Sequence, residues 1–296
     1  MNNFNPKNIL CPIDFSDLSD LALKYAVVCS REYGAKLTVL HAETFELPRY
    51  FSRKETGRLI QELDRAKTAI QEELAEHIEK ILGQETKNLN IEFEVVEEPP
   101  VDAILNTAKR KPVDLIVIGT RGLSGVKRLL LGSVTENVIR YATVPIFTVR
   151  QKEHEFIDIT RADTLPQIGR ILCPCEVNEL GRINLGYAVS LAERFNARLT
   201  VLYSDESLKG ADLSQAKETL CNWITETVKT RCDLEPVIRK GNAADQIITH
   251  AREEKDDLIV LGAYHRIFRD ATVLGKTTDL VVRHATVPVL IIPTFQ

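Results

Sequence analysis

Two glycines followed by a glycine–serine pair stand at a spacing that could hold a phosphate group. Gly119 and Gly122 open the stretch, nine residues separate Gly122 from Gly132, and Ser133 then starts a helical pattern. Glycine lets the backbone approach an anion closely and adopt positive φ. The amino end of a helix adds unpaired N–H groups and the positive end of the helix dipole. We therefore predict phosphate binding at this loop and helix start.

Neighbouring side chains suit the rest of a nucleotide. Arg121, Lys127 and Arg128 add positive charge to the loop, and Asp14 ends the first apolar run, where it could bond a base or a ribose. His41, which ends the second apolar run, is predicted to position the site rather than to catalyse. The alternative is a turn that uses glycine for its geometry alone. Because ligands of parallel sheets bind where these strands end, we favour nucleotide binding.

The chain repeats one pattern twice. Residues 9–14 return at 171–176, which is 162 residues later, and 114–119 return at 257–262, which is 143 residues later. The second copy therefore lacks 19 residues between these runs. A repeat of this length predicts two domains of one fold. The predicted parts are domain 1 over 1–150, a linker over 151–168 and domain 2 over 169–296.

Each copy alternates short apolar runs with longer helical patterns, which indicates parallel strands joined by helices. The runs are continuous, as expected of strands that helices cover on both faces. The first helix should be capped by Ser16 or Asp17 and stop at Gly34, where the second copy has Asn196, another residue that takes the left-handed conformation. The fold class is α/β, with two tandem doubly wound domains. The strands predicted in the first copy are 8–13, 36–42, 91–96, 114–119 and 145–150.

The second helix differs in length between the copies. In the first copy an apolar stripe runs from Leu59 to Ile81 and predicts a long helix that ends near Gly83. In the second copy a shorter helix is expected around 212–230. The irregular segment 43–55 before the long helix could be a lid over the strand ends or a loop packed on its own surface, and both remain open.

Composition narrows the class of protein. The chain has 296 residues, with 38 basic and 42 acidic side chains, so no global charge points to a nucleic acid or a membrane surface. The amino terminus lacks a signal-peptide pattern, and no apolar run reaches the length of a membrane span. We expect a cytoplasmic globular protein.

Cysteines and further histidines are predicted to have no chemical role. We expect Cys173 and Cys175, at the end of one strand, to point to opposite faces of the sheet, and no second ligand pair stands at metal spacing. We therefore do not favour a zinc or redox role for the two thiols. Four histidines are expected to be solvated residues of helices or of the linker: His77, His154, His250 and His284.

The glycine motif resembles the nucleotide-binding signature of the ATP-binding branch of the universal stress protein family. The runs at 9–16, 40–42 and 133–140 match the family as well. The resemblance covers essentially the whole chain as a tandem pair. It implies a Rossmann-like, five-stranded parallel sheet of order 3-2-1-4-5 in each domain. It also implies binding of ATP, or of ADP or AMP, with Mg²⁺ entering only together with the nucleotide.

Carried over position by position, the resemblance implies a site for each part of the nucleotide. Asp14 and Ala42 would hold the adenine, and Pro12 and Gly119 would flank the ribose. No catalytic residue and no metal ligand of the protein itself is predicted. The complete set of predicted nucleotide-binding residues is Pro12, Asp14, Ala42, Ile118, Gly119, Gly122, Gly132, Ser133 and Val134, of which the last four hold the phosphates.

Both copies depart from the family pattern. Glu98 stands in the first copy where the family has a glycine, whereas the second copy keeps Gly241 at that position. In the second copy His265 replaces the second glycine, and Glu176 replaces the aspartate. Lys276 follows a glycine as in a Walker A motif, but that motif also needs a glycine where this chain has an aspartate. We expect nucleotide in the first copy only. The second copy is either a site kept for structure or a site for another anion, held by His265, Arg266, Arg269 and Lys276.

The leading functional interpretation is a nucleotide-responsive regulatory module of the stress response rather than an enzyme, with at most slow, incidental ATP hydrolysis. A ligase of adenylate chemistry would need a glycine loop after the first strand, and residues 14–17 contain none. A purely structural interaction protein of the same fold, without a nucleotide, is the other alternative.

An exposed apolar edge must be covered, so we expect the last strands, 144–149 and 287–292, to join the domains as a pseudo-dimer. A further homodimer of chains and a protein partner that reads the bound state stay open.

Overall fold

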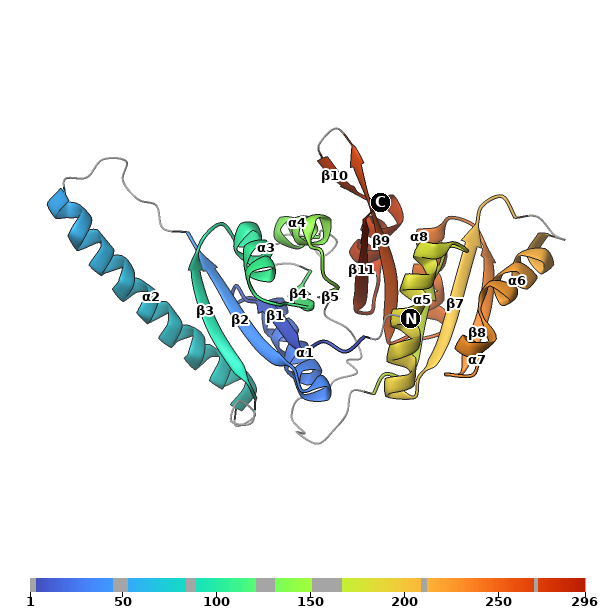
Figure 1. Cartoon of the computed structure of the whole chain (residues 1–296), viewed down its shortest axis with the longest axis horizontal. Helices are drawn as coiled ribbons and strands as arrows, with labels where there is room; N and C mark the ends of the chain where they lie inside the picture. The colour runs from blue at the N-terminus through green and yellow to red at the C-terminus, as the bar shows by residue number, and fades with distance from the viewer. Residues whose placement is uncertain are drawn as a thin grey trace.

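The two halves of the chain share one continuous β-sheet (Figure 1). The computed structural model describes residues 4–44, 53–83, 89–120, 131–150, 167–208, 212–268 and 271–295. Side chains are described within these ranges except at 53–60, 63–64, 227, 264–268, 271–273 and 295. The sheet has eleven strands, and helices cover both of its faces. Most of the predicted linker and of the segment 43–55 lies outside the described residues.

The first domain has the predicted strand order. Its strands run parallel in the order β3-β2-β1-β4-β5, so the predicted order 3-2-1-4-5 is confirmed. The bounds agree with the predicted runs to within one residue at each end. They are β1 (Asn8–Pro12), β2 (Lys36–Glu43), β3 (Ile91–Glu97), β4 (Leu115–Gly119) and β5 (Ile146–Val149).

The second domain repeats this order and adds one strand. Its parallel order is β8-β7-β6-β9-β11, and the extra strand β10 pairs antiparallel with the end of β9. The described residues of the first domain, which leave out 121–130, contain no equivalent of this hairpin. The bounds are β6 (Arg170–Pro174), β7 (Arg198–Asp205), β8 (Leu234–Lys240), β9 (Leu258–Phe268), β10 (Ala271–Leu274) and β11 (Val289–Phe295).

Helix ends follow the predicted capping signals. The Ser16 side chain caps the first helix by accepting from the Ser19 N–H, and Gly34 ends it in the left-handed conformation with φ 59°. Asn196 ends the equivalent helix of the second domain with φ 50°. The helices of the first domain are α1 (Asp17–Tyr33), α2 (Arg53–Leu82), α3 (Pro100–Arg110) and α4 (Ser133–Tyr141). Those of the second are α5 (Glu179–Phe195), α6 (Asp212–Trp223), α7 (Glu226–Lys229), α8 (Ala243–Glu253) and α9 (Lys276–His284).

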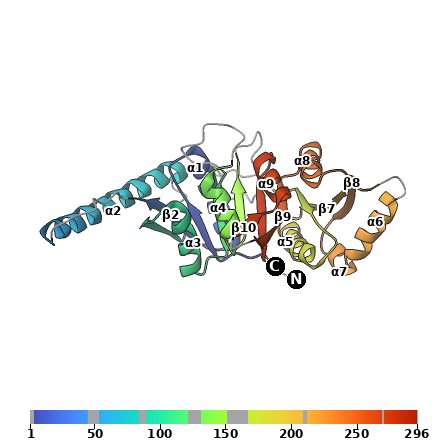
Figure 2. The same ribbon diagram turned by 90° about the horizontal axis from the view of Figure 1, so that it is seen from above.

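The long second helix is the main asymmetry between the domains. Helix α2 spans 30 residues and projects well beyond the sheet at its amino end (Figures 1 and 2). It ends just before Gly83, as predicted, and its carboxyl half packs Leu74 and Ile78 into the core. In the second domain the short helices α6 and α7 take its place. Among the described residues, no helix combines the length and the apolar character that crossing a membrane requires.

The last strands of the two domains join them edge to edge. Strands β5 and β11 pair antiparallel, with Phe147 opposite Leu290 and Ile146 opposite Ile291. The Thr148 hydroxyl also donates to the Val289 carbonyl at 3.1 Å. Antiparallel pairing of two equivalent strands is what an approximate two-fold axis produces. The predicted pseudo-dimer through the last strands is therefore confirmed.

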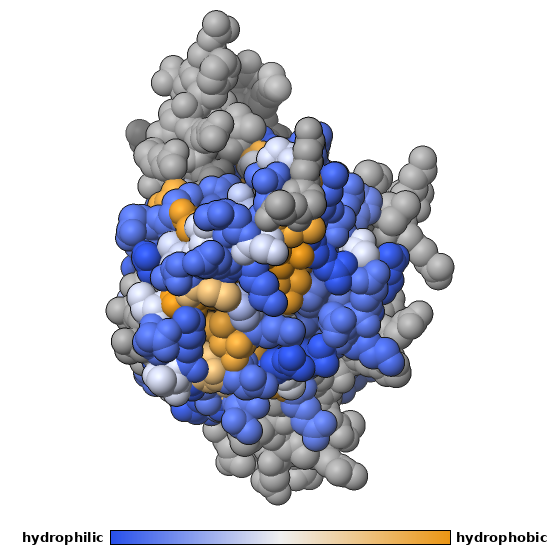
Figure 3. Space-filling model, turned by 90° about the vertical axis from the view of Figure 1, so that its right-hand side faces the viewer, coloured by the Kyte–Doolittle hydropathy of each residue, from blue (hydrophilic) through white to orange (hydrophobic). Residues whose placement is uncertain are grey.

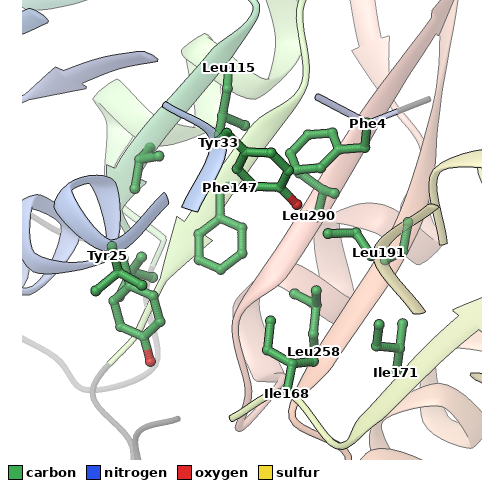
Figure 4. Close-up of a cluster of buried hydrophobic side chains, with 14 of the residues drawn as sticks. Phe4, Tyr25, Tyr33, Leu115, Phe147, Ile168, Ile171, Leu191, Leu258 and Leu290 are labelled. Atoms are coloured by element: carbon green, nitrogen blue, oxygen red, sulfur yellow. The ribbon is translucent and has the colours of Figure 1, made fainter. Parts of the chain in front are cut away.

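One hydrophobic core runs through this seam. Phe147, Tyr25, Leu258 and Leu290 are buried in a single cluster that draws on both domains (Figure 4). The amino-terminal segment also connects the two domains. The Phe4 ring packs edge-on against Tyr33 of α1, and the Phe4 N–H donates to the Ser190 hydroxyl of α5. The two domains therefore bury their apolar surface together.

The two outer edges of the sheet carry charged residues. On β3, Glu92 binds Lys36 at 2.7 Å and Lys111 at 2.9 Å, and these lysines hold the pKa of its carboxyl at about 2. On β8, Pro236 and a neighbouring Arg239–Glu253 ion pair interrupt the edge. Figure 3 shows a mostly hydrophilic surface over this end of the molecule. Charges and proline on an edge oppose further strand pairing.

Replacement of Leu290 by aspartate tests the seam. The side chain is fully buried between the domains, so Leu290→Asp should lower the free energy of unfolding by about 3–5 kcal/mol, because the carboxylate has no partner there. Urea denaturation gives the loss, and small-angle X-ray scattering should show an expanded chain. The control is Leu213→Asp on α6, where the side chain is already exposed. Equal unfolding midpoints for the two variants would contradict the burial of Leu290 between the domains.

Candidate functional site

Three strand ends converge at one place in the first domain. Strand β1 lies between β2 and β4, so the carboxyl ends of all three strands are neighbours. Pro12 closes β1, Ala42 lies near the end of β2, and Gly119 closes β4. The topology thus brings together the residues predicted for the base and the ribose. Their assignment to a nucleotide stays a prediction.

Asp14 lies in a turn that joins β1 to α1. Its Oδ1 accepts the Ser16 hydroxyl at 2.6 Å and the Ser16 N–H at 3.2 Å. Ser16 in turn caps α1, so the carboxylate and the helix start hold each other in place. The aspartate is only partly buried. Its position at the open end of the sheet is therefore fixed by local bonds before any ligand binds.

Phe15 has a left-handed backbone with φ 60°, which is unfavourable for a bulky residue. Its ring packs on His41 at 4.8 Å between centroids and on His77 at 5.0 Å. His41 is buried, and its Nδ1 lies 2.9 Å from the Ile13 carbonyl. These contacts hold the chain at the site, as the predicted positioning role of His41 requires.

His77 is not solvated, so that prediction is wrong. The side chain is three-quarters buried, and its Nε2 lies 2.8 Å from the Asp20 carboxylate. The helical pattern placed His77 on an exposed face of α2, but that face packs across the turn at Phe15. His250 is also wrongly predicted, since it is 3% exposed and its Nδ1 lies 3.0 Å from Asp256. His284 is exposed, as predicted, and His154 lies outside the described residues.

Gly119 is required by the packing of α1. A Cβ atom there would lie 2.8 Å from the Leu18 carbonyl oxygen and 3.0 Å from the carbonyl carbon. Both are main-chain atoms near the start of a helix and cannot move alone. Gly119 therefore lets β4 end directly against α1, and Ile118 beside it is buried. The glycine has a structural reason in addition to its predicted role beside a ligand.

The glycine-rich loop leaves the sheet and returns at the same point. The Gly132 N–H donates to the Thr120 carbonyl at 2.8 Å, which closes the loop. The Thr135 hydroxyl donates to the Gly119 carbonyl at 2.7 Å and ties α4 to β4. The loop itself, with Gly122 and the predicted cations Arg121, Lys127 and Arg128, lies outside the described residues.

The amino end of α4 follows directly on the bond that closes the loop. Gly132 is the residue that precedes the helix, and no side chain among the described residues caps it. Ser133 is exposed, and Val134 is partly buried. An uncapped helix start offers N–H donors and a positive dipole end to an anion. Gly132, Ser133 and Val134 lie at this helix start, and their role in phosphate binding stays a prediction.

Glu98 bonds to the third helix of the first domain. Its carboxylate accepts the Asn106 amide at 2.8 Å. The preceding Glu97 pairs with Lys67 of α2 at 3.3 Å. In the second domain the equivalent Gly241 has φ 135°, a conformation for which glycine is favoured. The replacement of this glycine by Glu98 therefore accompanies a different backbone conformation at the same position of the first domain.

The second domain replaces the glycine-rich loop by a β-hairpin. After Gly262 the chain continues as β9 and stays paired with β11 as far as His265, opposite Phe295. It then turns back as β10, which pairs with β9. The Ala263 carbonyl accepts the Thr294 hydroxyl at 3.0 Å, whereas the equivalent Thr120 carbonyl closes the loop of the first domain. The side chain of His265 lies outside the described ones, so the expectation that nucleotide binds only the first copy stays a prediction.

A cavity of about 1040 Å³ opens at the strand ends of the second domain. Cys175 and Glu176 line it from the end of β6, and the exposed Lys276 lies at the start of α9. Glu136 and Arg140 of α4 close one side, so both domains contribute to the wall. The sequence did not predict this cavity. Comparison of the two repeats shows that the loop is altered, but it does not show which residues of the two domains surround an open space.

The side of the cavity between the domains is held by ion pairs. Arg283 of α9 binds Asp279 at 2.8 Å and Glu136 of α4 at 2.9 Å. Both carboxylates raise the pKa of the Arg283 guanidinium above its ordinary value, Asp279 more strongly. Glu136 also pairs with Arg140 at 2.8 Å. These contacts fix α4 and α9 against each other across the seam.

The two thiols at the end of β6 lie together, which corrects the prediction of opposite faces. The Sγ atoms of Cys173 and Cys175 are 3.3 Å apart, and both residues are buried. Residues two positions apart along a strand point to the same face of a sheet. The expectation of opposite faces misapplied this alternation, which itself places Cys173 and Cys175 together. The Cys175 N–H bonds to the Leu202 carbonyl at 2.9 Å, as that of Ile13 bonds to Leu40 in the first domain.

Comparison with known proteins finds one family along nearly the whole chain. The model of the universal stress protein family matches residues 5–150 and 167–293. Universal stress protein MJ0531 of Methanocaldococcus jannaschii is 33% identical over 150 residues, which are 50% of this chain and 85% of that protein. A universal stress protein of Mycolicibacterium smegmatis is 22% identical over 296 residues and covers 96% of each chain.

A solved structure agrees with the tandem arrangement. The crystal structure of a universal stress protein from Archaeoglobus fulgidus has a TM-score of 0.63 at 21% identity. The match covers 96% of this chain and 95% of that chain. At this identity the likeness concerns the fold, and it extends over both domains.

Alanine at Gly119 tests the packing of the site. The added Cβ would meet main-chain atoms of Leu18 at 2.8 Å, so Gly119→Ala should lower the free energy of unfolding by about 1–3 kcal/mol through overpacking. The matched control is Gly262→Ala, where the nearest atom is 3.4 Å away on the Asn184 side chain. Urea denaturation should show the smaller loss for the control. A larger loss at Gly262 would refute the assigned close approach.

Proposed function

The chain belongs to the universal stress protein family, and from this premise we propose that its first domain binds an adenine nucleotide, ATP or its products ADP and AMP. The chain then acts as a nucleotide-responsive regulatory module of the stress response. The proposal has three parts: a place for the phosphates, a place for the base, and a single such site in each chain.

The phosphate part rests on the closed loop. The hydrogen bond from Gly132 to Thr120 places the uncapped start of α4 beside the end of β4. Anions bind favourably at such a helix start, because its N–H groups lack partners and its dipole end is positive. This closure is the observation that carries the proposal. Gly122, Gly132, Ser133 and Val134 would hold the phosphates.

The base part rests on Asp14. Its carboxylate is fixed by Ser16 at the end of β1, next to the ends of β2 and β4. A fixed carboxylate accepts hydrogen bonds from the exocyclic amine of adenine, whereas guanine presents a carbonyl at the equivalent position. Ala42 would lie along the base, and Pro12 and Gly119 would flank the ribose with Ile118 behind them.

A regulatory role fits the chemistry of the proposed residues better than catalysis does. The set consists of main-chain groups, small side chains and one carboxylate that is already bonded to Ser16. Such a set binds a nucleotide and does not supply a nucleophile with its base. We therefore propose that ATP hydrolysis, where it occurs, is slow and incidental.

The single-site part rests on the difference between the domains. In the second domain the segment after Gly262 is paired in the sheet and folds into the β9–β10 hairpin. A segment held in a hairpin is not free to wrap around phosphates, as we propose for the loop of the first domain. We propose that the second domain does not take the triphosphate, although its cavity is open.

Paired substitutions at equivalent aspartate and glutamate positions test the function. Asp14→Ala should weaken ATP binding by about 1–3 kcal/mol through loss of a charged acceptor, and it should reduce the preference for ATP over GTP. Glu176→Ala, the equivalent change in the second domain, should leave ATP affinity unchanged. Isothermal titration calorimetry with both nucleotides provides the measurement.

A third variant separates binding from folding. Asp14→Asn keeps an acceptor for Ser16 and removes the charge, so the turn should persist while ATP binding still weakens. Undiminished ATP affinity in Asp14→Ala would exclude the base-reading role. Absence of ATP binding in the parent chain would favour an interaction protein without a nucleotide.

A further inference from the structure

The buried thiols of Cys173 and Cys175, of which Cys175 lines the second-domain cavity, form a pair with no counterpart at the equivalent place of the first domain. The Sγ atoms of Cys173 and Cys175 lie 3.3 Å apart. At the equivalent place the first domain has Cys11 followed, two positions later, by Ile13. The single change from isoleucine to cysteine therefore creates a dithiol in one domain only.

The two thiols differ in their access to solvent. Cys173 is fully buried, whereas Cys175 is 7% exposed and lines the cavity of about 1040 Å³. A small molecule that enters the cavity can therefore reach Cys175 and not Cys173. Burial and the adjacent Cys175 sulfur raise the pKa of the Cys173 thiol well above its ordinary value. The Cys173 thiol thus stays protonated and lies deeper in the protein than the Cys175 thiol.

We propose that Cys173 and Cys175 are a redox-active dithiol, which a hydroperoxide entering the second-domain cavity converts into an intrachain disulfide. The inference stands on this cavity and this pair and does not depend on nucleotide binding in the first domain.

The reaction balances with hydrogen peroxide as the oxidant. The Cys175 thiolate attacks one peroxide oxygen, the O–O bond breaks, and the leaving hydroxide takes up the proton that the thiol released, giving water and a sulfenic acid. The Cys173 sulfur then attacks the Cys175 sulfur and the S–O bond breaks. The second hydroxide leaves as water with the Cys173 proton. Two thiols lose two electrons, and the peroxide gains them.

The geometry allows this bond with a small movement. A disulfide has its sulfurs about 2.05 Å apart, so the two Sγ atoms must approach by roughly 1.2 Å from 3.3 Å. The main chain of Cys175 is anchored to Leu202 of β7. Most of the movement therefore falls on the Cys175 side chain, which also contacts the Gly181 carbonyl at 3.8 Å.

This contact links the dithiol to the single tryptophan of the chain. Gly181 packs so closely that a Cβ atom there would lie 3.3 Å from the Trp223 ring. The neighbouring Arg182 places its guanidinium over that ring at 5.0 Å and donates to the Trp223 carbonyl at 3.1 Å. Moving Cys175 away from Gly181 should therefore change the surroundings of Trp223. Tryptophan fluorescence provides a direct readout.

Peroxide treatment of the full chain tests the proposal. After treatment, denaturation and alkylation, the peptide that contains both thiols should be lighter by two hydrogen atoms and carry no alkyl group. Dithiothreitol should restore two alkylation sites and the original Trp223 fluorescence. Cys175→Ile, which copies the first domain, should leave Cys173 alkylated and the fluorescence insensitive to peroxide.

Two further measurements test the sulfenic acid step at Cys175 and the adjacency of the two thiols separately. In Cys173→Ala the cavity-facing Cys175 should stop at the sulfenic acid, which dimedone labels. Phenylarsine oxide bridges adjacent thiols without any oxidant, so one equivalent should bind the parent chain and none should bind Cys175→Ile.

Alkylation of both thiols after a peroxide dose that oxidises the half-buried Cys221 would overturn the proposal. So would oxidation to sulfonic acids without a disulfide. Equal arsenical binding by the parent chain and Cys175→Ile would overturn the adjacency of the two thiols itself.

Discussion

The pairing of β5 with β11 is the interaction on which the rest of the molecule depends. In a sheet of order 3-2-1-4-5 the fifth strand is an edge, and in both domains the residues of this edge that pair across the seam, 146–148 and 289–291, are mostly apolar and buried. Left open, such an edge would pair with another chain. Antiparallel pairing of Phe147 with Leu290 satisfies both edges within one molecule and merges the two cores. The outer edges, β3 and β8, carry charges and a proline instead.

The seam also determines what surrounds each site. It brings α4 of the first domain against α9 of the second, where Arg283 binds Glu136. The amino end of α4 forms the proposed phosphate site, while Glu136 and Arg140 on the same helix line the cavity of the second domain. One short helix therefore belongs to both sites. The cavity takes its present form only because the two domains share a sheet.

Much of the fold could be predicted from local physical chemistry. Continuous apolar runs identified the strands, and Ser16, Gly34 and Asn196 marked helix ends through capping and left-handed conformations. Apolar last strands predicted the seam. For the candidate site, the sequence predicted a helix start at Ser133, and α4 begins there. The bond from Gly132 to Thr120, which holds this helix start beside the end of β4, could not be read from the glycine spacing. The ligand itself remains a proposal.

The features that sequence reasoning missed depend on contacts between distant segments. His250 is buried because it pairs with Asp256, and a helical pattern does not reveal such a partner. The two thiols at Cys173 and Cys175 are a different case, because residues two apart share one face of a strand and the sequence could have predicted their contact. The β9–β10 hairpin forms where the repeat predicted a loop, since β11 is long enough to keep pairing with β9. The cavity arises from packing that no local pattern encodes.

The central claim is that two copies of one fold share a sheet while only the first is built to hold a nucleotide. Native mass spectrometry of the full chain, with ATP at cellular concentration, measures the number of nucleotides in each molecule. The account predicts one adenine nucleotide for each chain. Two nucleotides for each chain would show that the hairpin of the second domain does not prevent binding, and none would show that the closed loop of the first domain is not a nucleotide site.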